Sequence, residues 1–360
     1  MKRNTFYIIT AFGLLTMLVL STLINAGVFK TIEPLNTEMC SVIEANMNGQ
    51  PLTRGGETKL SGAEDITFIP GTNQALVSAY DRRIEVADAK AAIQGAIYLY
   101  DLDTKSFTKI SPLLTDFKPH GISLYTDKKG VMRLFVVDHA NEKHQIQIFE
   151  FKEQTLTLVK TISHESIDSP NDIHAVGPEQ FYVTNDHGFT DGLMRVLEDY
   201  LMLPFSNVVY FDGVNAKEVA SGMPYANGIN SNQAGDEIYV TSVTSLKLHM
   251  YHRDVRSNEL SLYKSINTGT GIDNIEVDEN GDLWLGAHPQ LLKFAAHAKD
   301  KDKRSASEVL KVTISDGSYD VKTVYRNTGQ PLSGSSVAAV KVNRLLIGSV
   351  FDPMILDCQL

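Results

Sequence analysis

Six short signatures with polar side chains recur along this chain, and each opens an alternating apolar run. In each signature, one or two small polar or charged residues stand directly before Ile or Val. The six are Glu64-Asp65-Ile66, His120-Gly121-Ile122, Asn171-Asp172-Ile173, Asn227-Gly228-Ile229, Asp273-Asn274-Ile275 and Ser335-Ser336-Val337. Five of them offer carboxylate, amide or imidazole groups, which bind hard cations or transfer protons. The candidate chemistry therefore comes from separate repeats and not from one local motif.

The oxygen donors of these signatures resemble the ligand set of calcium. Calcium takes roughly six to eight oxygen ligands from carboxylates, amide carbonyls, main-chain carbonyls and water. The candidate ligands are Glu64, Asn171, Asn227, Asp273 and Asn274. Because only two of these side chains are charged, they do no more than balance the charge of Ca²⁺, and the bound ion can still polarise a substrate oxygen.

Asp65 and Asp172 stand directly beside candidate ligands in the sequence. Neighbouring residues of a strand point to opposite faces, so we expect these two carboxylates to point away from the first site. With the main-chain carbonyl of Ile122 they form a candidate second cation site, deeper in the protein. The competing interpretation is that Asn and Asp at a strand start only cap turns.

Histidines are the candidates for proton transfer. His120 opens the second signature, and His139 follows the strand-like run Val136-Val137-Asp138. A neutral imidazole at either position can accept a proton from a water that attacks a carbonyl carbon. His187 and His288 occupy comparable places in other repeats, and the alternative for each is a structural hydrogen bond. The chain has no Gly-x-Ser-x-Gly motif, which argues against a covalent serine mechanism.

The elements that position these residues are predicted to be strands. The signatures are roughly 45 to 62 residues apart, near the range of repeats that form radial β arrays. Strand-like runs and tight turns follow each signature without intervening helices, which predicts an all-β, six-bladed β-propeller. All six polar openings then meet at one mouth of the central channel. The segment from Asp191 to Leu203 has helical spacing of apolar residues and predicts a short inserted helix.

Composition describes an acidic globular protein. Of the 360 residues, 43% are hydrophobic and 21% are charged, and the net charge is −10. Binding to phosphate backbones needs a basic face, so this balance argues against a nucleic-acid partner. It is compatible with cation binding.

Residues 1–30 form a hydrophobic segment of their own. Lys2-Arg3 precedes an uncharged stretch, residues 4–29, which is longer than a usual signal-peptide core and long enough to span a bilayer. We expect an N-terminal hydrophobic helix that acts as an uncleaved signal-anchor and contacts membrane or lipid. A cleaved signal peptide ending at Ala26 is the alternative. In both cases residues 31–360 form the propeller domain outside the cytoplasm, membrane-anchored or, after cleavage, secreted.

The chain has only two cysteines, Cys40 and Cys358. In an exported protein such a pair predicts a disulfide, here one that ties the first ordered strand to the last blade. The chain-entropy model gives about 5 kcal/mol as an upper figure for a loop of this length. Two unpaired buried thiols are the alternative.

Several of these motifs together resemble the serum paraoxonase/arylesterase family. The similarity runs from Cys40 to Leu360. The matching motifs are Ala63-Glu64-Asp65-Ile66, Pro119-His120-Gly121-Ile122-Ser123, Asn171-Asp172-Ile173, Thr184-Asn185-Asp186-His187, Ala226-Asn227-Gly228-Ile229-Asn230, Asp273-Asn274-Ile275 and Leu346-Ile347-Gly348-Ser349-Val350-Phe351. These motifs occur in the same order as in the family, which makes the resemblance specific.

The resemblance implies a calcium-dependent hydrolase of lactones and aryl esters, with some organophosphates as promiscuous substrates. Two ions are implied, a catalytic one and a structural one. By match to the family pattern, the catalytic calcium is held by Glu64, Asn171, Asn227, Asp273 and Asn274, and the structural calcium by Asp65, Asp172 and the Ile122 carbonyl. His120 and His139 match a histidine pair proposed to activate water, with Asp273 or Glu64 as the competing base. The implied calcium polarises the carbonyl oxygen while the activated water attacks.

Some residues depart from the family pattern. Leu246 and Ala287 stand where some members carry His and Cys, Tyr225 replaces a common Phe, and the segment Tyr80-Asp81-Arg82-Arg83 is unusually charged. The metal set is intact, so these departures concern the preferred substrate. The alternative function is a non-catalytic, calcium-stabilised propeller that only binds a partner, because one fold hosts many functions.

Overall fold

A computed structural model describes residues 16–17, 19–52, 59–87, 94–140, 144–315 and 317–360, and it contains six four-stranded antiparallel sheets. The first blade comprises β2 (Ala63–Phe68), β3 (Gln74–Ala79), β4 (Ala96–Asp101) and β5 (Ser106–Lys109). The second comprises β6 (Pro119–Thr126), β7 (Met132–Asp138), β8 (Gln145–Lys152) and β9 (Thr155–Ile162). The third comprises β10 (Pro170–Ala175), β11 (Phe181–Asn185), β12 (Ser206–Phe211) and β13 (Ala216–Met223).

The remaining blades follow the same order. The fourth comprises β14 (Ala226–Ser231), β15 (Glu237–Ser242), β16 (Lys247–Arg253) and β17 (Leu260–Asn267). The fifth comprises β18 (Gly271–Val277), β19 (Leu283–His288), β20 (Ser307–Ser315) and β21 (Ser318–Asn327). The sixth comprises β22 (Ser335–Lys341), β23 (Arg344–Ser349), β24 (Ile355–Gln359) and, from the start of the chain, β1 (Cys40–Ile43), which a short 3-10 turn, η1 (Thr37–Met39), precedes.

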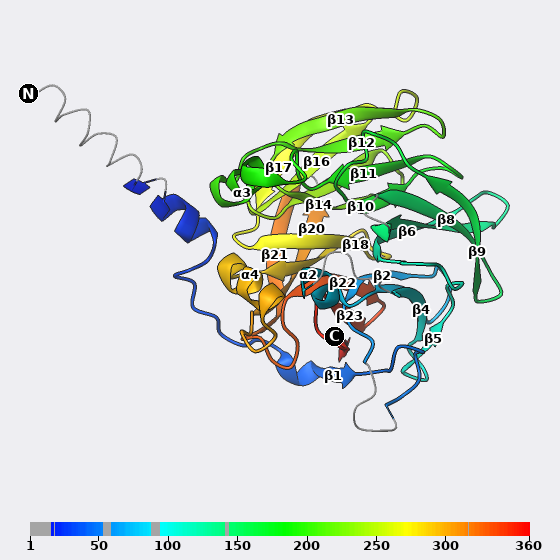
Figure 1. The fold of residues 1–360 in the computed structure, drawn as a ribbon, viewed down its shortest axis with the longest axis horizontal. Coiled ribbons are helices and arrows are strands. Elements are labelled where there is room, and N and C mark those ends of the chain that lie inside the picture. Colours follow the sequence, from blue (N-terminus) through cyan, green and yellow to red (C-terminus); the bar gives the residue numbers. More distant parts are fainter. Residues whose placement is uncertain (1–15, 18, 53–58, 88–93, 141–143, 316) are drawn as a thin grey trace, which may run out of the picture.

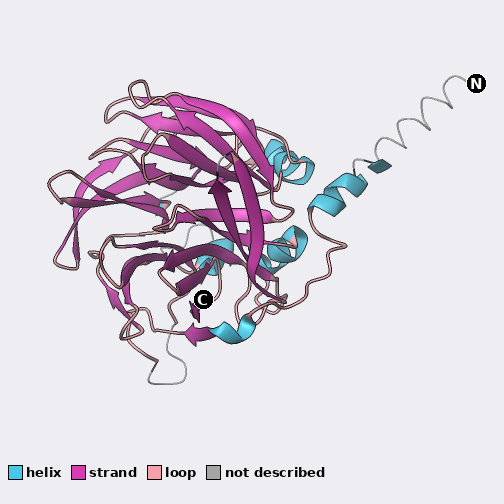
Figure 2. Cartoon of the chain, turned by 180° about the vertical axis from the view of Figure 1, so that it is seen from behind, coloured by secondary structure: helices cyan, strands magenta, loops and turns pink. Residues whose placement is uncertain are grey.

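The first strand of each blade lies innermost. β2, β6, β10, β14, β18 and β22 contact one another in this order, and β22 contacts β2 to close the ring. Strands make up most of the body in Figure 2. The prediction of a six-bladed propeller is therefore confirmed, and the six signatures lie on the six innermost strands.

Hydrophobic side chains fill the space between neighbouring blades. Ile66, Val77 and Tyr98 of the first blade share one buried cluster with Val337 and Leu346 of the sixth. Each fully buried aliphatic side chain contributes about 1.5–3 kcal/mol relative to exposure. Because the blades stack face to face, middle strands such as β19 are buried on both sides.

The first and last strands close the ring. β1 pairs with β24 in antiparallel register, which places Cys40 opposite Cys358, and the two form a disulfide. The predicted disulfide is confirmed.

Within the part of the chain that the structure describes, three α-helices lie between strands. The predicted inserted helix is present as α3 (Gly192–Leu201). Two others, α2 (Arg82–Ala87) and α4 (Leu291–Lys299), contradict the prediction that no helices interrupt the blades. α2 has only six residues, too few to separate a helical period from a loop. In Figures 1 and 2, α3 and α4 lie on the same side of the body as the N-terminal helical segment.

The described part of the N-terminal segment contacts this same side. The main-chain carbonyl of Ala26 accepts a hydrogen bond from the Leu291 amide at the start of α4, and Lys30 forms an ion pair with Glu308 at 3.4 Å. Within the described ranges, no helix is long and apolar enough to cross a membrane. Residues 1–15 and 18, on which the signal-anchor prediction depends, lie outside those ranges, so the anchor and the boundary at residue 30 stay predictions.

Candidate metal centre and active site

Every innermost strand carries a register shift at its signature. The shifts lie between Ala63 and Asp65, Pro119 and Ile122, Pro170 and Ile173, Ala226 and Ile229, Ile272 and Ile275, and Ser335 and Ala338. Such β-bulges insert an unpaired residue and re-aim side chains, commonly beside active sites. Because a bulge interrupts the period of two, strand alternation alone does not determine where Asp65 and Asp172 point.

Hydroxyl groups from neighbouring strands fix the main chain of four signatures. Four hydroxyls donate hydrogen bonds of 2.6 Å to signature carbonyls: Ser78 to His120, Thr184 to Asn227, Thr241 to Asp273 and Ser336 to Glu64. Each bond crosses from one blade to the next. The sequence does not reveal this hydrogen-bonding role, although Thr184 and Thr241 occupy the same place in the second strands of their blades.

Four of the five predicted ligands of the first site carry a buried oxygen without a hydrogen-bond partner. These atoms are Glu64 Oε2, Asn171 Oδ1, Asn227 Oδ1 and Asn274 Oδ1. Glu64 and Asn274 also contact each other directly, since Asn274 Nδ2 donates to Glu64 Oε1 at 2.8 Å. Buried polar atoms in proteins are nearly always paired. Four unpaired oxygens on four innermost strands fit a cation that prefers oxygen ligands.

The fifth predicted ligand, Asp273, is paired with His288. Asp273 Oδ2 lies 2.8 Å from His288 Nε2, and the His288 ring stacks on Phe294 of α4 with centroids 3.7 Å apart. Burial raises the pKa of Asp273, against the opposing effect of His288. His288 is therefore placed to orient the carboxylate of the predicted ligand Asp273.

Two nitrogen-bearing side chains approach Glu64. His120 Nε2 lies 3.6 Å from Glu64 Oε1, and Arg82 Nη2 of α2 lies 3.8 Å from Glu64 Oε2. Burial tends to raise the pKa of Glu64, but His120 and then Arg82 outweigh it and bring the value to about 2. The carboxylate is therefore ionised and available as a ligand. Arg82 belongs to the charged segment noted in the sequence.

The two carboxylates of the second predicted site are tied to main-chain amides. Asp65 accepts hydrogen bonds from the amides of Ile66 and Ile122, and Asp172 accepts them from Ile173 and Ile229. Burial, reinforced by Glu64, raises the pKa of Asp65 to about 8. Burial and then Asp65 raise the pKa of Asp172 well above its usual range. Two buried carboxylates that oppose each other's ionisation fit a shared cation.

The predicted ligands of both sites are all oxygen donors. Among the residues that the structure describes, no three His, Cys, Asp or Glu side chains gather in the way that typifies transition-metal sites. The first site offers three amides and two carboxylates, which suits calcium better than zinc. Asp65 and Asp172 also line a cavity of about 720 Å³ within the channel.

The predicted histidine pair extends to a third histidine. His120 Nδ1 lies 2.7 Å from His139 Nε2, and His139 Nδ1 lies 2.7 Å from His144 Nδ1. Burial lowers the pKa of His139 well below its usual value, and His120 and His144 act in the same direction. His139 is therefore held neutral. The sequence analysis did not identify His144, because nothing near it repeats in other blades.

His187 holds α3 rather than standing beside the predicted ligands as a base. Its Nδ1 lies 2.6 Å from Asp186, and its Nε2 lies 2.9 Å from Asp199 of α3. Burial tends to lower the pKa of His187, but the two aspartates outweigh it and raise the value to about 9. A base must be neutral to accept a proton, so this arrangement opposes a general-base role. Asp186 in turn contacts the predicted ligand Asn171 at 3.5 Å.

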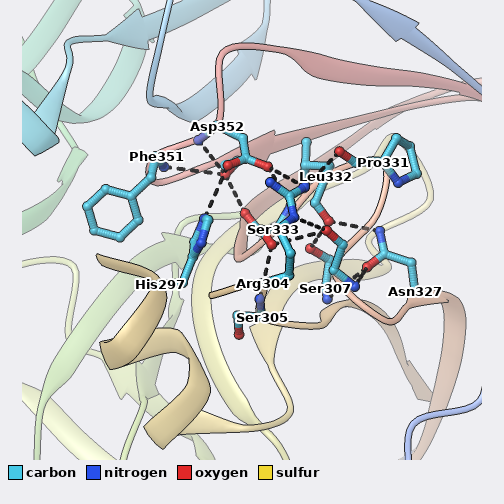
Figure 3. Close-up of polar contacts among 12 residues, drawn as sticks. His297, Arg304, Ser305, Ser307, Asn327, Pro331, Leu332, Ser333, Phe351 and Asp352 are labelled. Atoms are coloured by element: carbon cyan, nitrogen blue, oxygen red, sulfur yellow. Dashed lines mark hydrogen bonds and ion pairs between the residues drawn. The ribbon is translucent and has the colours of Figure 1, made fainter. Parts of the chain in front are cut away.

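A buried polar cluster around Asp352 holds the other two helices. Figure 3 shows Asp352 facing His297 of α4, Arg304 and Ser333. Asp352 lies 3.1 Å from His297 Nε2 and 3.0 Å from Arg304, and it accepts a hydrogen bond from the Ser333 amide. Arg83 of α2 donates to the Phe351 carbonyl at 2.9 Å. This cluster fixes α2, and with it Arg82, over Glu64.

The comparisons with known proteins agree with these observations. The family model described as Arylesterase matches residues 57–360. Serum paraoxonase/arylesterase 1 of Homo sapiens is 35% identical over 350 residues, covering 94% of this chain and 93% of the relative. Serum paraoxonase/arylesterase 2 of Gallus gallus is 39% identical over 320 residues, covering 86% and 88%.

Solved structures share the fold at much lower identity. A putative gluconolactonase has a TM-score of 0.52 at 14% identity, covering 91% of this chain and 97% of its own. A luciferin-regenerating enzyme has a TM-score of 0.51 at 13% identity, covering 83% and 91%. These two likenesses concern the propeller fold alone. The family model and the curated relatives go further: this chain belongs to the paraoxonase/arylesterase family.

Proposed function

We propose that this chain is a calcium-dependent hydrolase of lactones and aryl esters, with phosphotriesters as promiscuous substrates. The observation that carries the proposal is the set of four buried, unpaired oxygens of Glu64, Asn171, Asn227 and Asn274. Leaving such a group unpaired costs about 1–3 kcal/mol, which a bound cation offsets. The reaction class comes from the named relatives, which are paraoxonases and arylesterases.

The chain's own residues supply proton transfer. A calcium ion bound by the predicted ligands supplies Lewis-acid chemistry, polarising the carbonyl oxygen of an ester. His120 presents Nε2 on the side of Glu64 while Nδ1 is bonded to His139. His120 Nε2 is therefore the nitrogen that we assign to accept a hydrogen of the attacking water. Asp273 and Glu64 are the alternative bases, and the pKa of about 2 at Glu64 favours its role as a ligand.

A second ion is proposed between Asp65 and Asp172, with the Ile122 carbonyl as a further ligand. The raised pKa values of both carboxylates support it, because a cation removes the cost of two adjacent buried charges. Asp65 and Asp172 already bridge separate blades through main-chain amides. We therefore assign this ion a structural role.

The helices on the mouth side offer an apolar surface. Leu193, Val196 and Tyr200 of α3 are 72%, 49% and 61% exposed, and Ile24 and Phe29 of the N-terminal segment are 58% and 67% exposed. We propose that this surface contacts lipid and admits hydrophobic acyl chains. The Cys40–Cys358 disulfide supports a location of the propeller outside the cytoplasm.

Substitution of Asp273 by Ala tests the proposed activity against the alternative of a binding module. Initial rates on a lactone panel and on phenyl acetate are compared between the wild type and Asp273→Ala, at temperatures where both are folded by circular dichroism. The exposed Asp320→Ala, on β21 of the same blade, serves as control. We expect Asp273→Ala to lower kcat by at least about 100-fold, as for loss of charge stabilisation in a transition state.

Each alternative predicts a different pattern. The hydrolase loses turnover in folded Asp273→Ala protein and keeps it in Asp320→Ala. A calcium-stabilised binding module has no turnover in any variant, and Asp273→Ala changes its stability alone. Wild-type turnover that Asp273→Ala leaves intact contradicts the assigned site.

A further inference from the structure

Three histidines form a continuous hydrogen-bonded chain that begins beside Glu64. His120, His139 and His144 are joined by two contacts of 2.7 Å between ring nitrogens. The contacts leave His120 Nε2 on the side of Glu64 and His144 Nε2 at the far end. One set of neutral tautomers satisfies both contacts, with the hydrogen on Nδ1 of His120, Nδ1 of His139 and Nε2 of His144. His120 then donates to His139 Nε2, and His139 donates to His144 Nδ1.

The far end of this chain lies at the protein surface. His144 lines a cavity of about 360 Å³ together with Ser163, His164, Glu165, Ile167 and Asp168. Of these residues, Ser163, Glu165 and Asp168 are exposed. His144 therefore joins a buried ring, His139, to a polar surface cavity.

The proposed reaction requires a route for protons. At neutral pH, hydrolysis of a lactone converts a water and the lactone into a hydroxy-carboxylate and a free proton. One hydrogen of the attacking water ends on the ring oxygen that leaves, and the other must reach solvent. A site that excludes water needs a defined path for this transfer.

We propose that His144 completes a proton exit path from His120 through His139 to the surface cavity. This inference rests on the proposed hydrolase activity. His120 Nε2 takes a hydrogen of the water, and the Nδ1 hydrogen of His120 passes to His139 Nε2. The Nδ1 hydrogen of His139 then passes to His144 Nδ1, and the Nε2 hydrogen of His144 passes to solvent. Each ring gains a proton and loses a proton, so the charge leaves and none accumulates.

The charges around the chain differ between its middle ring, His139, and its outer ring, His144. Arg82 and Lys118 both oppose a positive charge on His139. The carboxylate of Asp168 interacts with His144 instead and favours a positive charge there. Because His144 acts through the His120–His139 pair, it is a positioning residue.

The test compares turnover of His144→Asn and His144→Ala with the wild type as buffer concentration varies. The control is His164→Asn, which alters the same cavity at a ring that accepts a hydrogen bond from the Ser166 amide of its own loop. With dilute buffer, we expect both His144 variants to lose about ten-fold in kcat at unchanged KM, a modest share of what proton transfer contributes. Added imidazole restores kcat in these variants and leaves the wild type and His164→Asn unchanged.

Nitrogen NMR of histidine-labelled protein gives a second readout, independent of turnover. We expect a strongly hydrogen-bonded Nδ1–H on His139 in the wild type and its loss in both His144 variants. Wild-type protein without turnover overturns the hydrolase and the exit path together. Wild-type turnover with a kcat that His144 substitution leaves intact, or a loss that imidazole does not restore, overturns the exit path alone.

Discussion

Asn227 and Asn230 show how differently two asparagines of one strand are used. Both lie on β14, but Asn230 Nδ2 donates to the Ile275 carbonyl at 2.9 Å, whereas Asn227 Oδ1 is buried without a partner. A structural amide is expected to be paired. The unpaired oxygen therefore marks the residue that we assign to calcium, and Asn230 is its natural control.

Substitution of Asn227 by Ala is expected to weaken calcium binding, measured by isothermal titration calorimetry. The dissociation constant should rise by at least roughly ten-fold, since even the hydrogen-bond partners of ligands contribute this much. Asn230→Ala should keep the wild-type affinity and lose about 1 kcal/mol of unfolding free energy. If the wild type and Asn227→Ala bind calcium with equal affinity, Asn227 is not a calcium ligand.

The sequence identified candidate site residues where the same kind of residue recurs at the same place in several repeats. Glu64, Asn171 and Asn227 each open an apolar run at similar spacing, so their type and place predict a shared mouth. His144 and Arg82 have no counterparts in other blades, and their contacts arise from tertiary packing. The β-bulges could not be predicted either, because no residue type identifies an unpaired position in a strand.

At the scale of elements, the strands were predictable and two helices were not. Alternating apolar runs identify the innermost strands, and the ten residues of α3 show a helical period. α2 and α4 are held instead by side-chain contacts, through Arg83 and His297 at the Asp352 cluster. Charge also holds α3, which His187 links to the third blade through Asp186 and Asp199.

Rising pH is expected to loosen α3. The pKa of His187 is about 9 in the folded protein against an ordinary value of 6.5, so its stabilising charge is fully present below pH 6.5 and is lost as pH rises through 9. Amide hydrogen exchange, corrected for intrinsic rates, should show falling protection of α3 between pH 7 and about 9.5. His187→Gln should have low protection at every pH. Constant protection of α3 in the wild type over this interval contradicts the role assigned to His187.

At the scale of the whole molecule, the ring is closed by its two ends. β1 and β24 pair in register, and their disulfide spans a sequence separation of 318 residues. The sequence predicted this closure, because two cysteines in an exported chain leave one pairing. The ends thereby complete the sixth blade, whose β22 packs against β2 beside Glu64.

Replacing both cysteines by Ser is expected to lower the thermal midpoint of unfolding while turnover at 25 °C persists. Loop-closure entropy sets an upper limit of about 5 kcal/mol on the lost unfolding free energy. The β1–β24 hydrogen bonds and the inter-blade core remain, so the folded site is kept. Scanning calorimetry and initial rates check both parts, and an unchanged midpoint contradicts the stabilising role of the bond.

The central claim is that bound calcium makes this propeller a hydrolase. The most direct measurement is the rate of lactone hydrolysis by the full chain before chelation, after chelation and after calcium is added back. Phenyl acetate is assayed in parallel. The account predicts turnover of both substrates, loss of that turnover on chelation, and recovery with calcium. Turnover that persists in chelator contradicts the calcium assignment, and a folded, calcium-loaded protein without turnover contradicts the hydrolase itself.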